Sequence, residues 1–128
     1  MDEGTFRACL VGLDGSSAGC ELTATDGTVL SDLRARLGCD WVERIQIGAI
    51  PGTGLVLEVW LDEEGMYNQP ANPVLEAMLT ALRGPLAQRL YGPAVFAAGS
   101  LNGEGTESLP EGIIEQLAGL ASALAAAR

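Results

Sequence analysis

The sequence feature that most constrains the fold is a pair of apolar runs, residues 41–49 and 55–61, separated by the turn-type sequence PGTG. Both runs are rich in Ile, Val and Trp, which favour strands, and the Pro and Gly residues between them favour a turn. Side chains within each run alternate between an apolar face and a mixed face that carries Arg44, Glu58 and Trp60. The runs therefore predict a β-hairpin with one face in the core, and Arg44 and Glu58 are expected to face each other across it.

The remaining elements follow from strand, helix and turn signals along the chain. We expect strands at 5–13 and 20–25, a helix near 29–37, a helix from Asn72 and Pro73 to Gly84, a helical turn within 85–92, a strand at 93–101, a loop at 102–106, and a final helix opened by the capping box Ser108–Glu111. The first strand is apolar on both faces, which predicts a central place in the sheet. Its hairpin, the next helix and the second hairpin resemble the start of a β-grasp arrangement.

These elements predict an α+β fold with ββαββαβα order. The sheet is expected to be mixed or antiparallel, with about five strands and with helices covering one of its faces. With 128 residues and 13.2 kDa, residues 1–128 are expected to form a single domain with enough buried surface for one core. No apolar run approaches the ~20 residues that span a bilayer, and the acidic N-terminus does not resemble a secretion signal. A cytoplasmic protein without membrane contact is therefore expected.

The numbers of acidic and basic residues exclude several classes of function. The chain has 17 acidic residues, seven basic residues that are all Arg, and a net charge of −10. Without Lys or His it has no His-based triad, no Schiff base, no Walker lysine and no His metal ligand. The acidic balance also argues against direct nucleic-acid binding, and it favours a partner with a basic surface. The three cysteines contain no CxxC pair and are expected to be buried, reduced thiols. We predict no catalytic residues, no metal site and no cofactor.

Three segments carry a resemblance to a known family. The sequences GLVLEVWLDEEGMYNQPANP, GPAVFAAG and SLPEGIIEQL occur in this order at 54–73, 92–99 and 108–117. In this order they resemble a domain family of unknown function that is numbered thirty-eight forty-six. The resemblance implies a small protein of bacteriophages, plasmids or other mobile elements in bacteria. It implies no activity that can be assigned to particular residues.

The stretch after the central hairpin is the candidate binding surface. It combines acids, amides and aromatic residues in a loop between a strand and a helix, and such loops often carry function. The candidate residues are Trp60, Asp62, Glu63, Glu64, Tyr67, Asn68 and Gln69. The acids lack the spacing of a calcium loop, so a solvated acidic turn is the simpler interpretation. Tyr67 is also open to a structural interpretation, in which its ring packs on the neighbouring helix.

Three functions are compatible with these observations. The first is a non-enzymatic protein of a mobile element that binds a host or defence protein. The second is an acidic DNA mimic of the antirestriction type, although only 62–64 forms an acidic cluster. The third is a small-molecule-binding module, or sponge, with a pocket beside the 62–72 loop. The absent residue types make an enzyme the least favoured class.

Overall fold

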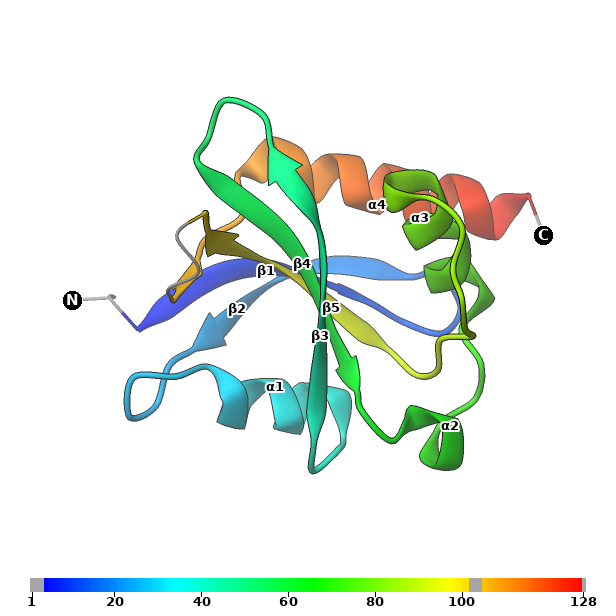
Figure 1. Ribbon diagram of the computed structural model, residues 1–128, viewed down its shortest axis with the longest axis horizontal. Coiled ribbons are helices and arrows are strands. Elements are labelled where there is room, and N and C mark those ends of the chain that lie inside the picture. The colour runs from blue at the N-terminus through cyan, green and yellow to red at the C-terminus, as the bar shows by residue number, and fades with distance from the viewer. Residues whose placement is uncertain (1–3, 102–104, 128) are drawn as a thin grey trace.

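The computed structural model describes residues 4–101 and 105–127, which form an antiparallel sheet with helices on both faces (Figure 1). Its elements are β1 (Thr5–Val11), β2 (Ser17–Thr23), α1 (Leu30–Leu37), β3 (Val42–Ile50), β4 (Leu55–Asp62), α2 (Gly65–Asn68), α3 (Pro73–Arg83), β5 (Ala94–Ser100), β6 (Thr106–Glu107) and α4 (Glu111–Ala126). The α+β class and the predicted order of elements are confirmed, with the short α2 and β6 as additions. The loop expected at 102–106 lies mostly outside the described residues.

The strand order is β2-β1-β5-β4-β3, every pair is antiparallel, and β6 pairs with β5. β1 lies between β2 and β5, as its two apolar faces predict: Ala8 is buried on one face, and Cys9 and Val11 on the other. β5 lies at the centre, and six of its seven residues are buried. A strand that follows both hairpins in the chain therefore joins them in the sheet.

Helices cover both faces of the sheet, so the expectation of one covered face is wrong. α3 and α4 pack on one face around Phe96, while α1 packs on the other face through Leu33 and Leu37 (Figure 1). The physical reason lies in β5, because Val95 and Ala97 point away from Phe96 and also need burial. α1 provides that cover, which gives three layers.

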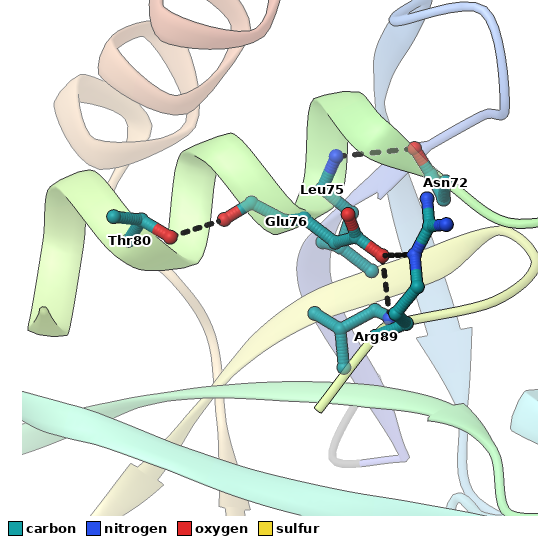
Figure 2. Close-up of polar contacts among 6 residues, drawn as sticks. Asn72, Leu75, Glu76, Thr80 and Arg89 are labelled. Atoms are coloured by element: carbon teal, nitrogen blue, oxygen red, sulfur yellow. Dashed lines mark hydrogen bonds and ion pairs between the residues drawn. The ribbon is translucent and has the colours of Figure 1, made fainter. Parts of the chain in front are cut away.

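The helical turn expected within 85–92 is absent, because α3 side chains engage the backbone of this segment. Glu76 Oε2 accepts hydrogen bonds from the Leu90 N–H at 2.8 Å and from Arg89 Nε at 3.2 Å (Figure 2). The Leu90 carbonyl accepts from the Asn72 N–H. The segment is thus held as a bent, irregular connection alongside α3, and it leads directly into β5.

The capping box expected at the start of α4 is also absent. Ser108 Oγ accepts a hydrogen bond from the backbone N–H of Arg7, at 3.0 Å, and it makes no cap to the helix. α4 begins at Glu111, and Glu111 forms an ion pair with the Arg7 side chain. Ser108 and Glu111 therefore bind the chain that follows β6 to β1. Only the tertiary structure brings these two segments close together.

Asn72 is the buried polar residue on which α3 depends. Its Oδ1 accepts from the Leu75 N–H at 3.1 Å, as the predicted N-cap requires (Figure 2). Its Nδ2 also donates to the Gly92 carbonyl at 2.9 Å, and the side chain is fully buried. One amide thus holds both the start of α3 and the chain that enters β5.

We expect Asn72→Ala to lower the free energy of unfolding by about 2–4 kcal/mol. The expected loss adds the cost of the missing helix cap to the cost of leaving the buried Gly92 carbonyl without its hydrogen-bond donor. Urea unfolding followed by circular dichroism measures the change. Asn68→Ala, at an exposed position, is the control and should change stability by less than about 0.5 kcal/mol. A cost at Asn72 as small as the control's would show that its buried hydrogen bonds contribute little.

Candidate functional site

The predicted binding residues lie at one end of the molecule, where β4 ends and the single turn of α2 projects from the sheet (Figure 1). Tyr67 on α2 is 79% exposed, and Met66 beside it is 60% exposed. The expectation that the Tyr67 ring packs on the neighbouring helix is therefore not met. Both side chains are available to a partner.

Asp62 and Gln69 are part of the scaffold rather than of an accessible surface. Asp62 is 4% exposed, and its Oδ1 accepts from the Glu64 N–H at 2.8 Å. Gln69 Nε2 lies 3.4 Å from Asp62 Oδ2 and 3.5 Å from the Leu37 carbonyl. These contacts tie the turn before α2 to the end of α1, so α2 is held in place at both its ends.

Trp60 lies on the α1 face of the sheet and is half-buried in the core there. The guanidinium carbon of Arg44 lies 5.9 Å from the centre of its ring. At this distance the arginine contacts the aromatic face as a cation–π pair. Trp60 is therefore mainly a packing residue, and the structure does not bring it into the exposed group around Tyr67.

Glu58, beside Trp60, is a buried carboxylate in the middle of β4. It is 5% exposed, and its Oε2 lies 3.3 Å from Arg44 Nη1, which confirms the expected pair, although the two residues are diagonal neighbours: Gln46 lies opposite Glu58, and Trp60 opposite Arg44. Burial raises the pKa of Glu58 above its ordinary value, and the Arg44 charge offsets only part of this effect. Gly99 on β5 makes room for the carboxylate, because a Cβ at Gly99 would lie 2.8 Å from Glu58 Oε2.

The raised pKa of Glu58 predicts a pH-dependent stability. A carboxyl with a raised folded pKa stabilises the fold fully below the unfolded value of about 4.3, and this stability is lost as the pH rises through the folded pKa. We therefore expect Glu58→Gln to gain stability relative to the unsubstituted protein between about pH 4 and about pH 7. Urea unfolding across this range measures the trend. The exposed Glu115→Gln is the control, and parallel curves for Glu58→Gln and the unsubstituted protein would contradict the prediction.

Trp41 belongs to the exposed group, although the alternation of its strand places it in the core. It is 59% exposed because β3 begins one residue later, at Val42. Its carbonyl accepts from the Glu63 N–H at 2.9 Å, so it lies against the turn that leads to α2. Trp41 lies across the hairpin from the turn-type residues at 62–65. These residues were the sequence signal that could have placed Trp41 beyond the end of the sheet.

Two hollows flank α2 and carry the acids of this region. One, of about 410 Å³, is lined by Glu43, Glu63 and Met66 together with residues 88–91. The other lies toward α1 and includes Asp40 and Glu64 in its lining. We call the combined area the acidic–aromatic surface, and its residues are Asp40, Trp41, Glu43, Glu63, Glu64, Met66 and Tyr67. The predicted residue Asn68 is exposed and lines the second hollow, at the border of this surface.

Arginines also reach both hollows, but the acids outnumber them. Arg89 lines the first hollow, and its Nε is held by Glu76 at 3.2 Å. Arg34 lines the second. The described residues contain no group of three or more His, Cys, Asp or Glu side chains that could hold a metal ion.

The three thiols are free: Cys9 and Cys20 lie on the paired strands β1 and β2, one residue apart in register and on opposite faces of the sheet, and Cys39 follows α1. Cys9 is fully buried, whereas Cys20 and Cys39 are only half-buried. Burial raises the pKa of Cys9 to about 11, and it also raises the pKa of Cys20 and of Cys39. A raised pKa leaves little thiolate at neutral pH, which disfavours nucleophilic reactivity.

We expect iodoacetamide at neutral pH to label the folded protein much more slowly than the urea-unfolded protein, and to label Cys9 last. The reason is the low thiolate fraction together with the burial of Cys9. Mass spectrometry of peptides after timed quenching measures the rate at each cysteine. Fast labelling of one cysteine in the folded protein would instead identify a reactive thiol.

Comparisons with known protein families, with curated proteins and with solved structures found no match to this chain. In the described ranges, no helix combines the length and the apolar character needed to cross a bilayer.

Proposed function

We propose that this protein acts by binding another protein that has a basic surface, and that the acidic–aromatic surface makes the contact. The observation that carries the proposal is the grouping of three large exposed side chains, Trp41, Met66 and Tyr67, at the end where Glu63 and Glu64 are also exposed. Large aromatic residues and Met are typical anchors of protein interfaces, where a few of them supply most of the binding energy.

The rigidity of α2 supports binding through this surface. Asp62 and Gln69 hold its two ends, and Gly65 within it is buried against Tyr91. A Cβ at Gly65 would lie 3.1 Å from both the Tyr91 carbonyl oxygen and its Cβ, so the helix packs closely on the segment before β5. An anchor that is already ordered loses less entropy when it binds, which favours affinity.

The charge of the surface supports a basic partner. Glu43 and Glu63 line the hollow that contains Met66, and Asp40 and Glu64 line the other hollow beside α2, in a chain whose net charge is −10. Carboxylates at a rim speed the approach of a cationic surface and oppose an anionic one. The resemblance to a family of mobile elements extends this proposal to a host or defence protein as the partner.

Capture from a bacterial lysate, with the tagged protein as bait, tests the proposal. We expect at least one protein to be retained, and its affinity to fall by about 1–3 kcal/mol for Tyr67→Ala and for Met66→Ala. Calorimetry with the purified partner measures these changes. Because the rim contacts are ionic, the affinity should also decrease as the salt concentration rises.

Leu101→Ala is the matched control, because Leu101 is as exposed as Met66 but lies at the opposite end of β5, outside the acidic–aromatic surface. It should leave binding unchanged. Melting temperatures of all three variants should remain close to that of the unsubstituted protein. The proposal would be contradicted if Leu101→Ala and Tyr67→Ala reduced the retention of the partner protein equally.

A further inference from the structure

A further hollow, separate from the two beside α2 and from the acidic–aromatic surface, lies between β3 and the helices α3 and α4. It encloses about 390 Å³, and Figure 1 shows the β3–β4 hairpin rising beside the start of α4. Its lining contains no charged side chain. The lining residues are Ile47, Gly48, Ala49, Ile50, Pro51, Leu57, Leu82, Ile113, Gln116, Leu117 and Leu120. We call this region the β3 groove.

One wall of the β3 groove is the edge of the sheet. β3 ends the strand order and pairs with β4 alone among the described strands. Alternate residues of such an edge direct their N–H and C=O groups away from the sheet, which is a template for another strand. Residues 45–50 contain neither a charge nor a proline, the two features that commonly protect an edge.

The end of β3 also leaves room for an added strand. A Cβ at Gly48 would meet no atom within 4 Å, and Ala49 is exposed. The register shift between Gln46 and Gly48 is followed by regular pairing of residues 48–50 with 55–57. This register shift, a β-bulge, therefore leaves regularly paired the part of the edge that lines the groove.

We propose that the β3 groove binds an extended, uncharged segment of a partner protein, which pairs with β3 and extends the sheet. Alternate side chains of an added strand point to one face, where the groove offers Leu82 and Leu120. The uncharged lining disfavours a charged ligand, because a charged side chain of the ligand would be buried in the groove without a counter-ion. Apolar residues at alternate positions are the complementary chemistry.

A second copy of the chain is a poorer occupant of the β3 groove. Two chains that each carry a charge of −10 repel one another over long range. An uncharged segment of another protein avoids this repulsion. The β3 groove shares no residue with the acidic–aromatic surface, so this inference does not depend on the function proposed above.

Selection from a displayed library of random nonapeptides tests the proposal, with the folded protein as the immobilised target. We expect selected peptides to have apolar residues at alternate positions and no charge at their centre. A synthetic copy of the best peptide should slow the exchange of alternate β3 amide protons, as measured by NMR. Gly48→Lys, which would place its side chain on the Leu57 face in open space, and Leu82→Lys, both at exposed positions, should weaken its binding about tenfold or more.

The control substitution is Ser31→Lys, which adds the same charge at an exposed position on α1 and should leave the affinity unchanged. Tyr67→Ala should also leave it unchanged, because Tyr67 belongs to the other surface. The proposal is overturned if no peptide is selected, or if the selected peptides bind Gly48→Lys as well as the unsubstituted protein. A dimer in sedimentation velocity that Gly48→Lys dissociates would also overturn it, and would assign the β3 groove to a second copy.

Discussion

The rest of the structure depends on the burial of β5 on both faces. Its residues are mostly small, and Ala94, Ala97 and Ala98 let neighbouring strands and helices pack closely on a strand that β1 and β4 flank. Each face then needs its own cover, because apolar side chains on an open face would remain in water. This requirement places α3 and α4 on one face and α1 on the other, and the sheet between them sets where every loop emerges.

Polar side chains of α3 connect this core to the candidate binding end. Asn72 and Glu76 engage the backbone at Gly92 and Leu90, just before β5, and thereby fix the path of the chain into the central strand. The same segment packs on Gly65, the first residue of α2, and on Gln69, which follows α2. The position of the exposed α2 side chains is therefore linked to the core through hydrogen bonds and close packing, rather than being left to a free loop.

The two proposed surfaces differ in the physical means by which they would select a ligand. The acidic–aromatic surface offers large apolar anchors with carboxylates around them, which suits a cationic protein surface. The β3 groove offers backbone groups and an uncharged lining, which suits an extended apolar segment. A partner that carries both features would contact two separated regions of one small protein, and linked contacts raise the overall affinity.

The sequence by itself determined the hairpin at 42–62, the Asn72 cap of α3, the strand and helix order and the α+β class, because these depend on local alternation and turn residues. It also located the exposed stretch around Tyr67. Only the tertiary structure decided that Ser108 binds Arg7 rather than capping α4, and that 85–92 runs beside Glu76 without a helical turn. It likewise made Asp62 and Gln69 scaffold residues and left Trp41 exposed. Ser108, Glu76 and Gln69 make their contacts with partners distant in the chain, about which local patterns carry no information, whereas the turn residues at 62–65 could have placed Trp41 beyond the end of the sheet.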